Sequence, residues 1–233
     1  MSQLSKVSAS DYFGSMVRSY DSLIRRAVPR YDEMTQRLIE YLPPTANHII
    51  ELGCGTGNLS LRLAQRYPSA RLTLVDAAPE MIDLTRGRLK SAHPKSAERA
   101  AFITSRFEDL ALYPKSFDLA TSCISLHHVR CKAPLYKVLH GALRPGGTFR
   151  FADQLRGATQ WIHDHDWARW LEFCRMPEHC TEEEVQSLLE HAAAHDFYTP
   201  LAEHFRLLEA AGFVHPDCVW RNWIWGVVTA DRE

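Results

Sequence analysis

A glycine-rich turn constrains this chain more than any other stretch of its sequence. The turn carries Gly53, Gly55 and Gly57, follows a short apolar run at 48–52, and precedes residues with helical spacing from 58 onward. Glycines remove Cβ atoms where the chain turns sharply, so backbone groups and a helix N-terminus can face a polar ligand. The spacing is GxGxG, and the Lys-Ser or Lys-Thr pair of a phosphate loop is missing. We therefore predict a strand, a tight turn and a helix around a ligand, with a dinucleotide site disfavoured.

An acidic residue completes this pattern. Asp76 closes the next apolar run, 72–75, and a helix signal containing Pro79 and Met81 follows it. An acid at the tip of the second strand commonly binds a ribose diol. Together, the turn and the acid predict an adenosine-containing ligand without a pyrophosphate.

Strand patterns alternate with helical patterns through most of the chain, which is typical of a parallel, doubly wound sheet. We predict an α/β fold with a mostly parallel seven-stranded sheet, whose last two strands, 213–220 and 222–229, pair antiparallel. A single domain is expected over 1–233, with N-terminal helices or a lid in 1–43 and a helical cap inserted at 155–200, after the fifth strand. The expected helices are 10–27, 31–42, 79–91, 132–143 and 201–211, and the expected strands before the cap are 48–52, 72–75, 101–104, 117–123 and part of 143–153.

The first helix has two interpretations. Residues 10–27 place Tyr12, Tyr20 and other apolar residues at helical spacing. Such a helix either packs against the sheet or covers the ligand as a lid. The sequence does not separate these alternatives.

Composition limits the possible partners and location. The formal net charge is −1, so no electrostatic footprint for nucleic acid stands out. No apolar run is long enough to span a membrane, and the polar start lacks the apolar core of a signal peptide. We expect a cytoplasmic protein without membrane contact, with a homodimer as one possibility. The six cysteines lack CxxC spacing, so reduced, buried thiols are expected.

The segment Glu51-Leu-Gly-Cys-Gly-Thr-Gly, together with Asp76, resembles the S-adenosylmethionine site of class I methyltransferases. The later segments 117–129 and 143–153 match the fourth and fifth strands of that superfamily in order. Over the whole chain, the N-terminal run 20–31 and the tail around 187–213 resemble a narrower group, the carboxy-S-adenosylmethionine synthases and related methyltransferase-like proteins.

The resemblance implies S-adenosylmethionine as the cofactor, and it implies a set of contacts to it. The synthases of the narrower group have an Arg that pairs with the extra carboxylate of carboxy-S-adenosylmethionine, and this chain has Gln186 at that place. Gln cannot supply the two charged hydrogen bonds that an Arg gives to a carboxylate. Ordinary S-adenosylmethionine is therefore expected here. Arg106 stands where the methyltransferase pattern usually has Asp, and Cys123 stands where the synthases have Asn. The implied cofactor-binding residues are Tyr31, Glu51, Gly53, Cys54, Gly55, Gly57, Asp76, Ala77, Met81, Arg106, Phe107 and Cys123.

Three residues are candidates for catalysis. His127 and His128 follow the fourth strand, where one imidazole, which we assign to His127, can act as a general base near neutral pH or else be structural. Asp153 can orient such a base, hold substrate or cap the next helix. Tyr31 can face a sulfonium with its ring. The run 163–166, His-Asp-His-Asp, fans around different faces of a helix, so we expect a solvated surface there and no metal site.

We predict an S-adenosylmethionine-dependent enzyme, a methyltransferase acting on a small-molecule acceptor. Two alternatives keep the same cofactor pocket: cyclisation of the cofactor to a four-membered amino acid with release of methylthioadenosine, and chemistry like that of the carboxy-S-adenosylmethionine synthases. A non-catalytic cofactor-binding partner protein is a third alternative, and a nicotinamide dehydrogenase is a distant fourth. The sequence does not identify the acceptor or choose between transfer and cyclisation.

Overall fold

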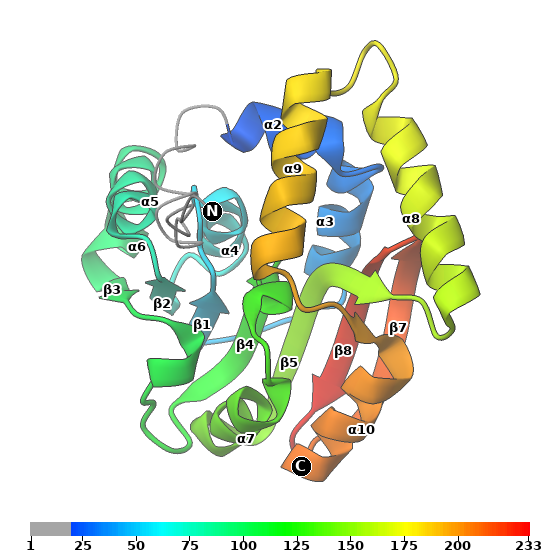
Figure 1. Ribbon diagram of the computed structural model, residues 1–233. Helices are drawn as coiled ribbons and strands as arrows, with labels where there is room; N and C mark the ends of the chain where they lie inside the picture. Colours follow the sequence, from blue (N-terminus) through cyan, green and yellow to red (C-terminus); the bar gives the residue numbers. More distant parts are fainter. Residues whose placement is uncertain (1–19) are drawn as a thin grey trace, which may run out of the picture.

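A central twisted sheet carries helices on both faces in the computed structural model, which describes residues 20–233 (Figure 1). The strand order is β3-β2-β1-β4-β5-β8-β7, and the short β6 pairs with β5. The strands are β1 His48–Leu52, β2 Arg71–Asp76, β3 Ala101–Thr104, β4 Phe117–Cys123, β5 Leu143–Arg156, β6 Thr199–Pro200, β7 Val214–Asn222 and β8 Trp225–Asp231. The α-helices are α2 Tyr20–Ala27, α3 Tyr31–Glu40, α4 Asn58–Arg66, α5 Pro79–Ala92, α6 Pro94–Arg99, α7 Lys132–Ala142, α8 Gln160–Cys174, α9 Glu182–His195 and α10 Leu201–Ala211.

The sheet confirms the predicted α/β, mostly parallel architecture. β1 lies between β2 and β4, so the strand order reverses at β1 and a crevice opens at the carboxyl ends of these strands. β8 runs antiparallel to both β5 and β7, as expected for the last two strands. The two-residue β6 was not predicted, because so short a strand carries no periodic signal.

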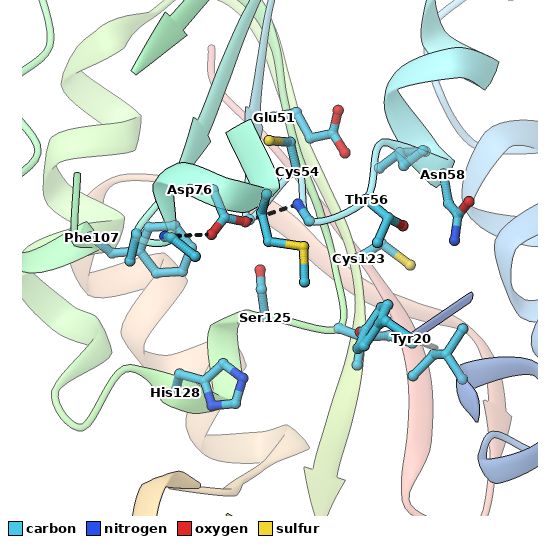
Figure 2. Close-up of a pocket in the computed structure, with 18 of the residues that line it drawn as sticks. Tyr20, Glu51, Cys54, Thr56, Asn58, Asp76, Phe107, Cys123, Ser125 and His128 are labelled. Atoms are coloured by element: carbon cyan, nitrogen blue, oxygen red, sulfur yellow. Dashed lines mark hydrogen bonds between the residues drawn. The ribbon is translucent and has the colours of Figure 1, made fainter. Parts of the chain in front are cut away.

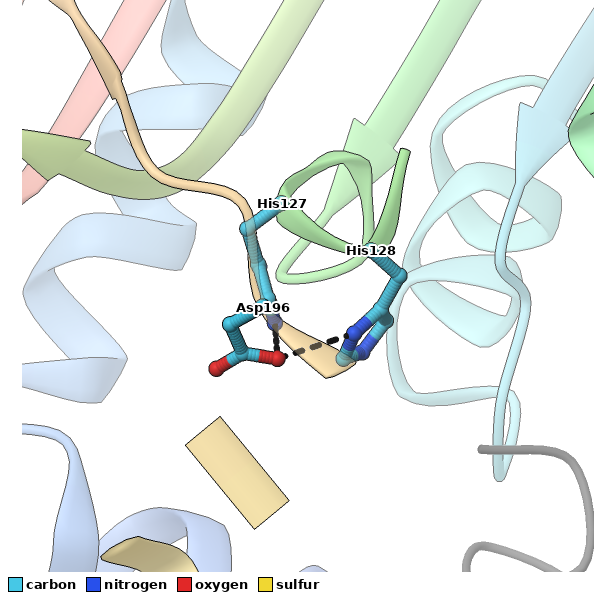
Figure 3. Close-up of side chains that lie close together, drawn as sticks. All are labelled: His127, His128 and Asp196. Atoms are coloured by element: carbon cyan, nitrogen blue, oxygen red, sulfur yellow. Dashed lines mark ion pairs between the residues drawn. The ribbon is translucent and has the colours of Figure 1, made fainter. Parts of the chain in front are cut away.

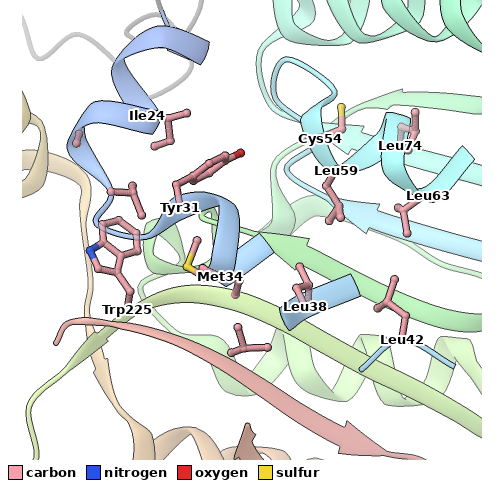
Figure 4. Close-up of a cluster of buried hydrophobic side chains, with 14 of the residues drawn as sticks. Ile24, Tyr31, Met34, Leu38, Leu42, Cys54, Leu59, Leu63, Leu74 and Trp225 are labelled. Carbon is pink, nitrogen blue, oxygen red and sulfur yellow. The ribbon is translucent and has the colours of Figure 1, made fainter. Parts of the chain in front are cut away.

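Alternate residues of the strands feed two cores on opposite faces of the sheet. On β1, Ile49 packs into the cluster with Met34, Leu38 and Leu63, while its neighbour Ile50 packs into the other cluster. Figure 4 shows the first cluster between α3, α4 and the sheet. The second cluster lies under α7 and α10 and is built around the fully buried Tyr136. A strand buried on both faces reads as a continuous apolar run, which is why β1 was found from sequence.

The helices α2, α8 and α9 are joined by specific polar contacts. The indole Nε1 of Trp170 on α8 donates to the carbonyl of Ala27 at 2.9 Å. The Arg26 guanidinium on α2 donates to both carboxylate oxygens of Glu184 on α9, at 2.6 and 2.7 Å. Glu184 also closes a capping box with Thr181 at the start of α9. Residues 10–19 of the expected first helix, including Tyr12, lie outside the described residues, so the lid remains a prediction.

All six cysteines are free thiols, in agreement with the expectation of reduced cysteines. Cys54, Cys174 and Cys180 are buried, but Cys131 is exposed because it lies at the N-cap of α7. Between residues 20 and 233, every helix is too short or too polar to cross a membrane.

Candidate active site

A cavity of about 710 Å³ opens beside the carboxyl ends of β1, β2 and β4 (Figure 2). Its wall combines the glycine turn, the end of β2, the loop after β3, the end of β4, and residues from α2, α3 and the end of α9. Such a position, outside the strand ends at the point where the strand order reverses, is where ligands bind in open α/β sheets.

The glycine turn is held against β2 by its own backbone. The amides of Gly53 and Cys54 both donate to the carbonyl of Val75, at 2.8 and 2.9 Å. Gly53 and Gly55 have φ of +70° and +51°, a region that favours glycine. A Cβ on Gly55 would meet no atom within 4 Å, so this turn leaves open space that a ligand can occupy.

Asp76 links this turn to the cavity. Its Oδ2 accepts from the Gly55 amide at 2.8 Å and its Oδ1 accepts from the Ala78 amide at 2.9 Å. Burial raises the pKa of this carboxyl, and the backbone amides of Ala78, Gly55 and Ala77 oppose that rise. The arrangement places a carboxylate with fixed orientation in the cavity wall, as a ribose-binding acid requires.

Eleven of the twelve predicted cofactor-binding residues line the cavity, and Gly57 is the exception. Gly57 is the N-cap residue of α4 with φ +89°, and a Cβ there would lie 3.0 Å from Thr85 Oγ1. The glycine at this position is therefore explained by helix initiation and packing. The lining also includes His128, the second histidine considered as a base, and residues that the sequence did not indicate: Arg25, Thr35, Asn58, Arg62, Glu108, Ser125, Arg130, Ala194, His195 and Phe197.

Glu51 is fully buried below the turn, where its Oε2 accepts from Ser60 Oγ at 2.6 Å. Burial raises its pKa to about 8, so the folded protein holds a proton on this carboxyl through neutral pH. The unfolded chain releases that proton near the ordinary value of 4.5. The free energy of unfolding therefore falls as pH rises between these two values, by up to about 1.4 kcal/mol per pH unit from this group.

We expect Glu51→Gln to remove this part of the pH dependence. Without cofactor, the variant should gain stability relative to the parent protein from pH 5 to pH 8, because an amide resembles the protonated acid and does not titrate. Urea unfolding at several pH values measures the difference, with Glu209→Gln on the exposed face of α10 as the control. A constant difference between variant and parent across this range would contradict a protonated Glu51.

The loop after β3 forms one side of the cavity. Phe107 lines it, and the ring lies within 3.5 Å of the position that a Cβ on Gly53 would take. Arg106 also lines the cavity, but its side chain is 72% exposed and lies 3.6 Å from the Glu108 carboxylate. Phe107 is therefore placed to stack on a planar ring, while Arg106 faces mostly solvent.

The predicted base His127 lies in a second, buried polar cluster (Figure 3). Its Nδ1 is 2.5 Å from Asp153 Oδ1, and its backbone amide donates to Asp153 Oδ2 at 3.0 Å. Although burial opposes the change, the charges of Asp153 and Asp196 raise the pKa of His127. Asp153 therefore orients His127, which was one of its predicted roles, and it does not cap a helix.

His127 lines a smaller cavity of about 70 Å³, and it is His128 that lines both cavities. Burial and the neighbouring His127 lower the pKa of His128. Asp196, which follows α9, lies with its Oδ1 3.1 Å from His128 Nδ1, and its Oδ2 accepts from the Tyr198 hydroxyl at 2.5 Å. Asp196 is a functional candidate that the sequence did not indicate.

Trp161, Trp170 and the run 163–166 lie outside the main cavity. Trp161 is exposed, and Trp170 lines only the smaller cavity. Within the described residues, the run 163–166 forms no group of side chains able to hold a metal, and Asp166 pairs with Arg221 at 3.4 Å. Asp164 and His165 of this run are exposed.

Comparison with known proteins agrees with this geometry. Residues 49–147 match the family described as a methyltransferase domain. The chain is 27% identical to the ubiquinone/menaquinone biosynthesis C-methyltransferase UbiE of Paracoccus denitrificans over 60% of this chain and 61% of that protein. It is 33% identical to the trans-aconitate 2-methyltransferase of Paracidovorax citrulli over 54% of this chain and 46% of that protein. The chain thus spans about half the length of the curated relatives it matches.

Solved structures share the fold. The phosphoethanolamine N-methyltransferase 2 of Haemonchus contortus, solved with phosphomonomethylethanolamine and S-adenosylhomocysteine, superposes with a TM-score of 0.70 at 13% identity, over 97% of this chain and 61% of that chain. An S-adenosylmethionine-dependent methyltransferase from Mesorhizobium loti superposes with a TM-score of 0.61 at 19% identity, over 84% and 96% of the two chains. Residues 49–147 therefore match a methyltransferase domain, and the chain shares the fold of these solved methyltransferases.

Proposed function

We propose that this protein binds S-adenosylmethionine in the main cavity and transfers its methyl group to a small-molecule acceptor. The observation that carries the proposal is the joint placement of the open glycine turn and the fixed Asp76 carboxylate in one cavity wall. These residues fit the cofactor because Gly55 leaves space for close approach and Asp76 offers acceptor oxygens for hydroxyls. When bound, the cofactor supplies an electrophilic methyl group on a cationic sulfur.

The chain's own residues would bind and orient the two reactants. Tyr20 and Tyr31 line the cavity, and rings that face a sulfonium stabilise it by roughly 0.5 to 2 kcal/mol. Alignment of the reacting groups supplies much of the barrier reduction in such displacements. His127, Asp153 and Tyr31 remain our predicted catalytic residues, with Asp153 acting only through His127. Cys123, Ser125 and His128 form the wall where β4 ends.

The relatives favour methyl transfer over the cyclisation and carboxylation alternatives, because the matched proteins are named as methyltransferases. Their names cover quinone, tricarboxylate and phosphoamine acceptors, so we infer a small-molecule acceptor without choosing its class. The narrower resemblance to carboxy-S-adenosylmethionine synthases stays a prediction, as do a homodimer, the cytoplasmic location and the division into lid and cap.

Two measurements test the proposal. First, S-adenosylhomocysteine should raise the melting temperature while NAD does not, since a ligand at 100 times its Kd stabilises a protein by about 2.7 kcal/mol. No shift with S-adenosylhomocysteine would refute the cofactor assignment.

Second, the protein is incubated with S-adenosylmethionine, alone and with quinols, carboxylic acids and amines, and the nucleoside product is identified by mass spectrometry. S-adenosylhomocysteine that forms only with an acceptor supports methyl transfer. Methylthioadenosine formed without an acceptor, above the uncatalysed background, would replace transfer by cyclisation.

A further inference from the structure

We propose that His127, His128 and Asp196 bind a divalent transition-metal ion, of the zinc type, in the smaller cavity next to the cofactor site. One donor atom from each of these residues lies within 4.8 Å of the other two. Asp196 Oδ1 lies 3.8 Å from His127 Nε2 and 3.1 Å from His128 Nδ1 (Figure 3). Ligands about 2.0 to 2.2 Å from a tetrahedral ion are separated by distances of roughly this size.

The groups behind these donors are those that metal sites use to orient their ligands. His127 turns its Nδ1 to Asp153, which leaves Nε2 directed at Asp196. A histidine held by a carboxylate on its other nitrogen is the usual arrangement of a ligating imidazole. The Tyr198 hydroxyl likewise holds the second oxygen of Asp196. Asp153 and Asp196 are both about 95% buried or more, so this orientation is maintained by packing.

Charge balance gives a second reason to place a cation here. Two buried carboxylates, Asp153 and Asp196, face the same imidazole beside a cavity whose lining is mostly apolar but also includes Gln154, His191 and Tyr198. Buried charges need compensation, because burial without it costs several kcal/mol. Lys132 is buried nearby, but its Nζ donates to the carbonyls of Val129 and Phe197 rather than to either acid. A divalent cation would balance the two acids, and a proton on His127 is the competing possibility.

The cavity beside the donors leaves room for a further ligand. It measures about 70 Å³ and is lined by His127, His128 and Asp196. One water occupies about 30 Å³ of liquid volume, so an ion with a bound water fits. Three protein ligands with an open position are typical of catalytic zinc, which lowers the pKa of a bound hydroxyl or thiol. Because His128 lines both cavities, such an ion would lie next to the cofactor cavity and could hold the acceptor.

The ion's role in methyl transfer rests on the proposed function, but the binding of the ion does not.

Metal binding is tested on protein without a polyhistidine tag. The protein is stripped with a chelator and dialysed against zinc, and its metal content is then measured by plasma mass spectrometry. We expect stoichiometric zinc in the parent protein and its loss in Asp196→Asn. Tyr198→Phe removes only the hydroxyl behind Asp196 and should weaken zinc affinity by about 10-fold or more. Ligand-field bands with cobalt(II) would report the tetrahedral site.

His165→Gln is the matched control, since His165 is an exposed histidine in the run 163–166 and should leave zinc binding unchanged. Binding of S-adenosylhomocysteine confirms that each variant is folded, because neither Asp196 nor Tyr198 lines the cofactor cavity. Zinc retained equally by the parent and Asp196→Asn, or absent from a folded parent, would overturn the proposal in favour of a proton on His127. A parent protein that binds zinc but not S-adenosylhomocysteine would overturn the proposed function instead.

Discussion

Replacing Gly53 by alanine is expected to destabilise the protein and abolish binding of S-adenosylhomocysteine. Gly53 has φ +70°, and an added Cβ would lie 2.4 Å from both Cβ and Oγ of Ser125. Ser125 cannot easily move, since its Oγ donates to the Leu52 carbonyl at 3.0 Å and lies 2.7 Å from Ser122 Oγ. The left-handed backbone costs about 1 to 2 kcal/mol, and the inserted methyl costs about 1 to 3 kcal/mol. Urea unfolding and calorimetric titration measure both effects.

Gly146→Ala separates the two contributions. Gly146 is exposed, has φ +76°, and a Cβ there would meet nothing within 4 Å. This variant should therefore show the backbone cost alone and bind S-adenosylhomocysteine normally. If Gly53→Ala were no less stable than Gly146→Ala, the close packing between the turn and Ser125 would be contradicted.

Asp76→Ala should weaken S-adenosylhomocysteine affinity by about 1 to 3 kcal/mol through loss of charged hydrogen bonds. That range corresponds to a roughly 5- to 150-fold higher Kd. The fold should survive, because the amides of Gly55 and Ala78 would face the cavity, where water can solvate them. Isothermal titration calorimetry with S-adenosylhomocysteine measures the affinity.

Two further variants sharpen this experiment. Asp76→Asn keeps the shape but turns an amide nitrogen toward one of the two backbone amides, so it should also bind more weakly. Asp83→Ala, on the exposed side of α5, removes only a surface ion pair with Arg86 and serves as the control. An unchanged Kd in Asp76→Ala would remove this residue from the cofactor site.

Local patterns along the sequence predicted most of the fold and the part of the cavity wall that the glycine turn and Asp76 form. The apolar runs of β1, β2 and β4 mark strands buried on both faces, and the glycines and Asp76 stand at the ends of those strands. In a parallel sheet, neighbouring strand ends must meet at one edge, so these residues could be brought together by topology alone. Gly212 directly follows the predicted helix 201–211 and ends α10 with φ +104°, because a left-handed residue after a helix is usually glycine.

Only the tertiary structure decided which side chains meet in the smaller cavity beside the main one. Asp196 lies about seventy residues after His128 in the chain, yet its carboxylate is 3.1 Å from that imidazole. No periodicity connects the end of α9 to the loop after β4, because their meeting depends on how α8 and α9 pack on the sheet. Which histidine reaches the main cavity likewise follows from the turn of 3-10 helix at 126–128, since His127 lines only the smaller cavity and His128 lines both. The positions of strand ends can be predicted from sequence because sheet pairing is regular. The contacts of α8 and α9 with the rest of the protein depend on side-chain packing, which the sequence does not display.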